Sequence, residues 1–141
     1  MTETNCTAVV TGTGEGRDGG RAASDDGLLD LTLAVPKEFG GDGGATSPEQ
    51  PLAAGWASRF PGAVKIAAAE RRVRVRDVAV VAEVTLHRRH EQGDHSLGAV
   101  LTLEAGGVDQ RTAGQLATGA HRVRPSSKAL AVPVTVEATA A

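Results

Sequence analysis

The chain has 141 residues, enough for one domain with a hydrophobic core and too few for two. Its formal net charge of −2 argues against a general nucleic-acid binder, because neutralising phosphates requires a surplus of lysine and arginine. Hydrophobic residues make up 40% of the chain but aromatic residues only 2%, so a core of Val, Leu, Ile and Ala is expected. These residues bury less area each, which makes burial across a dimer attractive.

Cys6 is the single cysteine, so an intramolecular disulfide is excluded. No segment approaches the roughly 18 apolar residues that a membrane span needs. The polar residues 1–5 lack the positive charge and apolar run of a signal peptide. We therefore expect a soluble cytoplasmic protein without a membrane partner.

The first third of the chain indicates two strands and glycine-rich turns. Residues 7–13 alternate weakly and predict a strand, and residues 12–20 predict a hairpin turn. Residues 29–35 alternate with period two, and Pro36 ends that second strand. The loop at 40–44 is rich in glycine, but it lacks the Lys-Ser/Thr pair and the glycine spacing of a phosphate-binding loop.

A long helix is predicted next. Ser47 can cap its start, Pro48 suits the first position, and Glu49 places an acid in the first turn. The helical region extends to about Arg72. Pro61 lies inside it, and an interior proline costs roughly 3 kcal/mol, so we expect a break or kink near residues 60–61.

The second half predicts a hairpin, a helix and a strand. Residues 73–87 are rich in β-formers, 87–95 form a polar tip, and 97–103 return as the partner strand. Residues 109–121 have helical composition, and 132–136 close the fold as an edge strand because of Pro133. The order of hairpin, helix, hairpin, helix and strand indicates an α+β fold.

Two charged clusters invite functional interpretations that we do not favour. The hairpin tip holds His87, His90 and His95 with Glu91 and Asp94, but this spacing fits no standard metal site, so a solvated loop is expected. The basic run of Arg71, Arg72, Arg74 and Arg76 is most simply a solvated face, or a set of cations at a helix C-terminus. No metal and no cofactor is predicted.

Two stretches carry a family resemblance: PEQPLAAGWASRF at 48–60 and AHRVRPSS at 120–127. Both resemble the organic hydroperoxide resistance (Ohr) branch of the OsmC-like family, in which each stretch is centred on a catalytic cysteine. The similarity extends to SDDGLLD at 24–30 and PKEFGG at 36–41, and so covers nearly the whole chain. It implies a single OsmC/Ohr-like domain over residues 1–141. It also implies an intertwined homodimer, with antiparallel sheets around central helices and active sites at the dimer interface.

The resemblance also implies roles for individual residues. Arg59 takes the place of the peroxidatic cysteine, and Arg124 that of the resolving cysteine. Arg17, aligned after a one-residue insertion, matches the arginine that activates the reactive thiolate, and Glu49 matches the acid that pairs with it. Peroxide reduction needs a low-pKa thiolate and a second thiol. Neither is present and Cys6 lies far off in sequence, so a thiol peroxidase is not expected.

If the fold is kept, Arg17, Glu49, Arg59 and Arg124 would converge in one positively charged pocket. Such a pocket suits a small hydrophobic carboxylate, phosphate or enolate ligand. His121 could move a proton, although a packed or capping role is favoured. The expected function is non-redox acid–base chemistry, such as isomerisation, dehydration or cyclisation in a biosynthetic pathway. The alternatives are a non-catalytic small-molecule binder and a residual peroxide stress protein. A further alternative is that Arg59 and Arg124 are replacements that face solvent or form structural ion pairs.

Overall fold

The computed structural model describes residues 3–89, 93–123 and 133–141. The chain divides into two compact units, Met1–Gln50 and Pro51–Ala141, which are described separately. Among the described residues, the helices are too short or too polar to cross a membrane.

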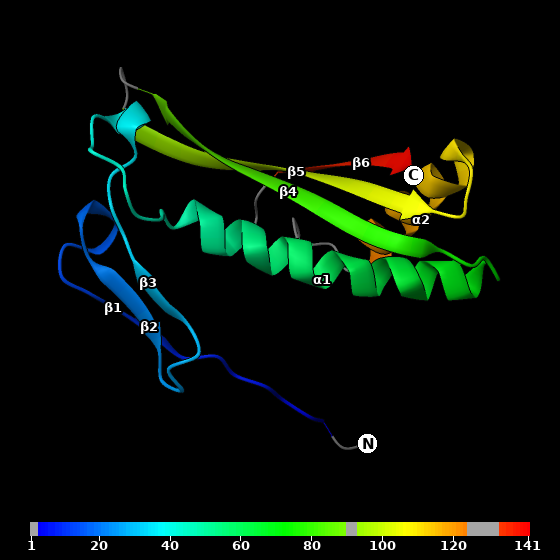
Figure 1. The fold of residues 1–141 in the computed structure, drawn as a ribbon, viewed down its shortest axis with the longest axis horizontal. Helices are drawn as coiled ribbons and strands as arrows, with labels where there is room; N and C mark the ends of the chain where they lie inside the picture. The colour runs from blue at the N-terminus through cyan, green and yellow to red at the C-terminus, as the bar shows by residue number, and fades with distance from the viewer. Residues whose placement is uncertain (1–2, 90–92, 124–132) are drawn as a thin grey trace. The chain divides into compact units, whose positions relative to one another are not determined.

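The first unit contains a three-stranded antiparallel sheet of β1 (Val10–Thr13), β2 (Arg21–Ser24) and β3 (Asp30–Thr32), in that order (Figure 1). The first and third strands match the two predicted strands, whereas β2 is not among the predicted elements. The predicted turn at 12–20 holds a short 3-10 helix, η1 (Gly16–Asp18). A β-carbon on Gly20 would meet the backbone of Thr13 and Gly16, so this close turn requires glycine.

The chain then leads to the long helix through a loop with little regular structure. Leu33 forms an isolated parallel bridge with Thr46, and a second short 3-10 helix, η2, spans Lys37–Phe39. Leu33 is the buried hydrophobic residue of this unit among those described. Backbone hydrogen bonds, rather than an apolar core, therefore hold most of the first unit in shape.

Helix α1 (Glu49–Glu70) runs through Pro61 as one helix, so of the predicted break or kink near residues 60–61 the break is wrong. The residues on either side of the proline, Phe60 and Ala63–Val64, are buried in the core of the second unit. That packing offsets the lost backbone hydrogen bond. The helix ends where Arg72 takes a left-handed conformation with φ 55°, and the Val73 amide donates to the Ala68 carbonyl at 2.9 Å.

The second unit has a mixed sheet of β4 (Arg76–Arg89), β5 (Asp94–Gly106) and β6 (Val134–Ala140), in that order. Strands β4 and β5 form the predicted hairpin. Strand β6 lies parallel to β5, which corrects the expectation of antiparallel sheets. Helix α2 (Gln110–Val123) connects β5 to β6 and returns the chain to the start of the sheet, and a parallel pair requires such a crossover. As predicted, the strand after Pro133 is an edge strand.

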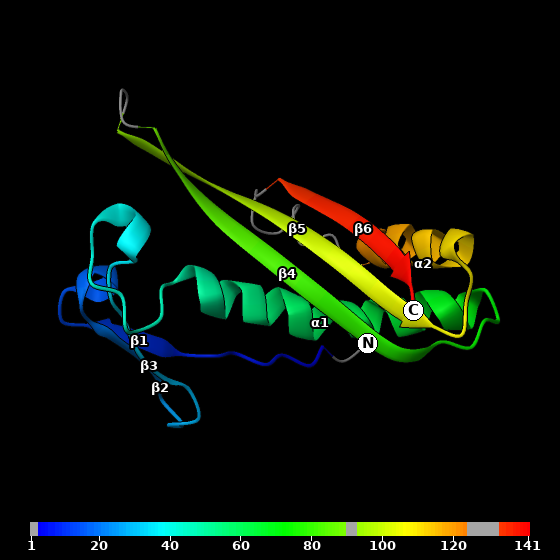
Figure 2. The same cartoon turned by 45° about the horizontal axis from the view of Figure 1, so that its top comes forward.

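The core of the second unit lies between this sheet and the two helices, which pack on one face of it (Figure 2). Alanines dominate it, together with a few larger side chains. The fully buried larger residues are Val64, Leu101, Leu103 and Leu116. Asp109 caps α2, because its carboxylate accepts a hydrogen bond of 2.7 Å from the Thr112 amide. The predicted core of Val, Leu and Ala is confirmed in the main, but Trp56 and Phe60 are also buried in it. The fold class is α+β.

Candidate functional site

An arginine and a glutamate pair within the first unit. Arg17 lies in η1 and Glu49 is the first residue of α1, 32 positions later. Nη1 of Arg17 lies 3.2 Å from Oε1 of Glu49, and Nη2 lies 3.5 Å from Oε2, so the guanidinium faces the carboxylate with both nitrogens. The Glu49 side chain is 15% exposed and that of Arg17 36%. The two residues that the family resemblance singled out as partners are therefore in contact.

Glu49 is held as a carboxylate. Partial burial alone would raise the pKa of Glu49, because it removes water from the charged form. Hydrogen bonds from the Ser47 hydroxyl and from the backbone amide of Glu49, together with the charge and hydrogen bond of Arg17, outweigh burial and lower that pKa below its ordinary value. The sequence marked Ser47 only as a helix cap. Its hydroxyl also stabilises the charge of the candidate acid.

Arg59 stands in the middle of α1, one turn after the buried Trp56 and next to the buried Phe60. Its side chain is exposed. The ion pairs formed by the described residues are Arg17–Glu49 and Arg21–Asp30, so Arg59 has no carboxylate partner among them. Within the described part of the chain, Arg59 is thus an exposed cation without an ion-pair partner, next to buried apolar side chains.

The two helices of the second unit run antiparallel in close contact. A β-carbon on Gly119 of α2 would lie 3.3 Å from the Ala67 side chain of α1, and Nη2 of Arg71 lies 3.5 Å from the Gln115 carbonyl oxygen. The helices therefore run in opposite directions where they touch, and the residues of α2 beyond Gly119 lie toward the part of α1 that carries Arg59.

His121 lies in this last part of α2. The residue is half-buried, and its Nδ1 is buried with no hydrogen-bond partner among the described residues. Arg124, the fifth predicted site residue, lies outside the described residues. The structure therefore pairs Arg17 with Glu49 in the first unit and places Arg59 and His121 on adjoining helices of the second. Convergence of all five in one pocket stays a prediction.

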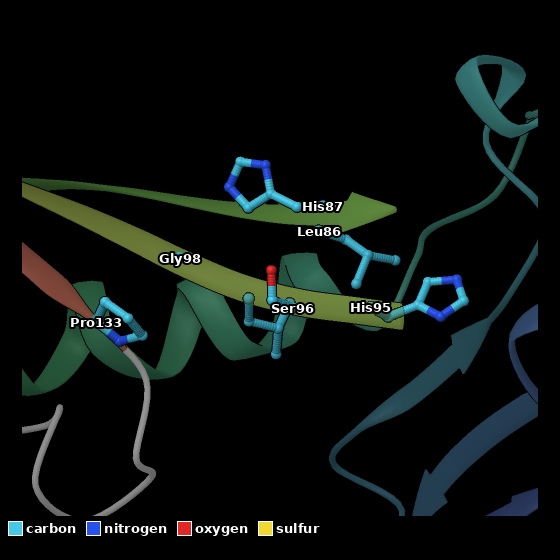
Figure 3. A pocket seen from close by; sticks show the side chains of 7 residues that line it. Leu86, His87, His95, Ser96, Gly98 and Pro133 are labelled. Atoms are coloured by element: carbon cyan, nitrogen blue, oxygen red, sulfur yellow. The ribbon is translucent and has the colours of Figure 1, made fainter. Parts of the chain in front are cut away.

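The two described histidines of the hairpin, His87 and His95, do not form a metal-binding cluster with other described residues. Figure 3 shows His87 and His95 projecting in different directions from β4 and β5. Residues 90 and 91 of the considered metal set lie outside the described residues. Within the described part of the chain, no three His, Cys, Asp or Glu residues are placed to hold a metal ion.

A hollow of about 630 Å³ lies at this hairpin, lined by Leu86, His87, His95, Ser96, Leu97, Gly98 and Pro133 (Figure 3). None of the four predicted site residues that the structure describes lines it. Cys6, the single cysteine, is exposed and precedes β1.

The chain is similar to proteins that bear one family name, although no protein-family model matches it. OhrB of Bacillus subtilis, an organic hydroperoxide resistance protein, is 37% identical over 125 residues, which span 87% of this chain and 88% of OhrB. The structure of an organic hydroperoxide resistance protein from Legionella pneumophila has a TM-score of 0.83 and 37% identity, over 99% of each chain. A Vibrio cholerae structure described under the same name has a TM-score of 0.79 and 34% identity, over 98% of this chain and 93% of that one. With this identity and coverage, the chain belongs to the OsmC/Ohr family.

Proposed function

We propose that this protein does not reduce peroxides with thiols, but binds and transforms a small hydrophobic organic anion by non-redox chemistry. The observation that carries the proposal is the Arg17–Glu49 pair, which is formed in a chain whose single cysteine is exposed outside both helices. This chain keeps the Arg17–Glu49 pair, which would activate the reactive thiolate in the family that it resembles. At the position of that cysteine on α1 it has Arg59.

The chemistry of these groups suits an anionic ligand. Arg59, with Arg124 beside it in the proposed pocket, would bind a carboxylate or stabilise an enolate with charge-assisted hydrogen bonds. Glu49 is ionised and can accept a proton, and His121 can exchange one. Isomerisation, dehydration and ring closure all need this combination of a base and a stabilised oxyanion. A biosynthetic pathway is the setting that we propose.

We further propose that the working form is a homodimer. The outward side of α1 carries small residues, Gly55, Gly62 and Ala69, at seven-residue spacing, and Ile66 on that side is 40% exposed. A β-carbon on Gly55 or Gly62 would meet open space. A helix that is apolar nearly all round is typically buried, and a second copy would cover this side.

The dimer is tested by sedimentation velocity at micromolar concentration. Wild type should sediment at twice the 14.3 kDa mass of the chain. Ile66→Glu should shift the protein toward monomer, whereas Lys65→Glu, at an exposed position one residue away, should not. A folded wild-type monomer would contradict this architecture.

The anion site is tested with octanoate, using the fluorescence of Trp56, the single tryptophan, one turn from Arg59. Arg59→Ala and Arg124→Ala should each weaken binding by about 1.5–3 kcal/mol, the range for charge-assisted hydrogen bonds. Arg111→Ala, an exposed arginine at the start of α2, is the matched control and should bind as wild type does. Equal affinity in all four proteins would show that Arg59 and Arg124 do not bind the anion.

The names of the relatives favour a second candidate, a role in organic hydroperoxide resistance. Cumene hydroperoxide and a dithiol reductant separate the two. We expect no turnover above a Cys6→Ser control. Robust turnover that is lost in Cys6→Ser would assign the peroxidatic role to Cys6. The double variant Arg59→Cys/Arg124→Cys, which restores both thiols, should gain peroxide reduction if Arg17 and Glu49 still serve the site.

The Vibrio cholerae relative holds captopril in one of its active sites. A site of this fold can therefore admit a small organic molecule in that protein. This supports a ligand pocket in the present chain without bearing on turnover.

A further inference from the structure

One buried side-chain nitrogen has no hydrogen-bond partner among the described residues. Nδ1 of His121 is shielded from solvent and makes no hydrogen bond with the described residues, and it is the one side-chain nitrogen or oxygen among them in this position. Buried polar atoms in folded proteins are nearly always hydrogen-bonded, and leaving one unpaired is costly. A group outside the described chain is therefore needed to satisfy it.

The surroundings of His121 offer no substitute. The buried side of α2 consists of Ala113, Leu116, Ala117 and Ala120, and the buried side of α1 near it consists of Ala63, Val64, Ala67 and Ala68. None of these side chains can donate or accept a hydrogen bond. The buried side chains of both helices are therefore apolar, and none of them can satisfy Nδ1.

We infer that Nδ1 of His121 binds a hydroxyl group of the ligand, so that the ligand class is a hydroxy acid rather than a plain carboxylic acid. This inference rests on the proposed anion site at Arg59. By the antiparallel register, His121 lies about level with Lys65, some 9 Å along α1 from Arg59. An acid bound at Arg59 would extend its chain toward His121. A hydroxyl fits either imidazole tautomer, because it can both donate and accept.

The test compares octanoate with its 3-, 5- and 8-hydroxy derivatives in wild type, His121→Asn and His121→Gln, by Trp56 fluorescence. Asn places a polar atom where Nδ1 stands, and Gln places it where Nε2 stands. At least one hydroxy acid should bind wild type about 3- to 10-fold more tightly than octanoate, the range for one net hydrogen bond. That gain should persist in His121→Asn and vanish in His121→Gln.

Two outcomes overturn the inference while leaving the anion site intact. Either no hydroxy acid binds more tightly than octanoate, or the gain survives unchanged in His121→Gln. A purely structural role for His121 would lower the thermal midpoint of the variants and leave the ratio of affinities unchanged. Failure of the anion site itself looks different: octanoate would not bind, or would bind Arg59→Ala as it binds wild type.

Discussion

The two compact units of the chain differ in net charge and in the number of buried hydrophobic residues. The first, residues 1–50, has three basic and nine acidic residues, a net charge of −6, and Leu33 as its buried hydrophobic residue among those described. The second, residues 51–141, has twelve basic and eight acidic residues, a net charge of +4, and holds the other buried hydrophobic residues described. The formal charge of −2 conceals this asymmetry.

The comparison shows where the stability and the candidate chemistry lie. Hydrophobic burial is the main favourable term in folding, so the second unit should dominate the free energy of unfolding. The best-defined candidate pair, Arg17–Glu49, lies in the first unit, which is stabilised mainly by turns and hydrogen bonds. Substitutions that remove apolar volume should therefore act on one unit, and substitutions that disturb the backbone or an ion pair on the other.

The largest effect is expected from the core of the second unit. Leu101→Ala removes a side chain that is 0% exposed in the central strand, and should lower the free energy of unfolding by about 2–5 kcal/mol. Leu28→Ala, at a residue of the first unit that is 89% exposed, should change it by less than about 0.5 kcal/mol. Urea denaturation of both variants measures the contrast. Similar losses would show that the first unit also depends on apolar burial, through a surface that covers Leu28.

The next largest loss of stability is expected from a substitution that disturbs the backbone of the first unit. Gly20→Ala would force a β-carbon against the backbone of Thr13 and Gly16, and should destabilise the protein by about 1–3 kcal/mol. Gly12→Ala, in the neighbouring strand, meets nothing within 4 Å and serves as its control. Thermal denaturation should show a lower midpoint for Gly20→Ala alone. An unchanged midpoint would mean that the turn relaxes at little cost.

A smaller effect is expected from Glu49 and depends on pH. The pKa of Glu49 is lower in the folded protein than its ordinary value of 4.5, so its stabilisation is present above that pH. It is lost as the pH falls through the folded pKa. Glu49→Gln should therefore cost about 1 kcal/mol at pH 7, and the difference from wild type should shrink below about pH 4.5. Thermal midpoints between pH 3 and 7 test this, and a constant difference would exclude the linkage.

The smallest effect is expected from the second ion pair of the same unit. Arg21 and Asp30 pair across strands with both side chains exposed, and the pairing lowers the pKa of Asp30. Water and salt screen such a pair, so Asp30→Asn should leave the thermal midpoint within experimental error at 0.15 M salt. A loss as large as that of Glu49→Gln would show that burial is not what distinguishes the two pairs.

Local sequence signals were sufficient for much of the fold. A run of β-forming residues on each side of a polar tip predicted the β4–β5 hairpin. Pro133 predicted an edge strand, because a residue without an amide hydrogen cannot join a central ladder. The helical composition of residues 109–121 predicted α2. For the site, the family resemblance indicated that Arg17 and Glu49 act together, which residue spacing alone could not show across 32 positions.

Other features depend on contacts between distant segments, and only the tertiary structure decided them. Helix α1 continues through Pro61 because Phe60 and Val64 are packed against the sheet, and that packing outweighs the local cost of proline. Strand β6 lies parallel to β5 because α2 carries the chain back across one face of the sheet. The short strand β2 is specified by its neighbours β1 and β3 rather than by its own four residues. The exposure of Arg59 and the unpaired Nδ1 of His121 follow from which side of each helix faces the core. The amino-acid sequence fixes the residues on a helix, but only packing decides which of them are covered.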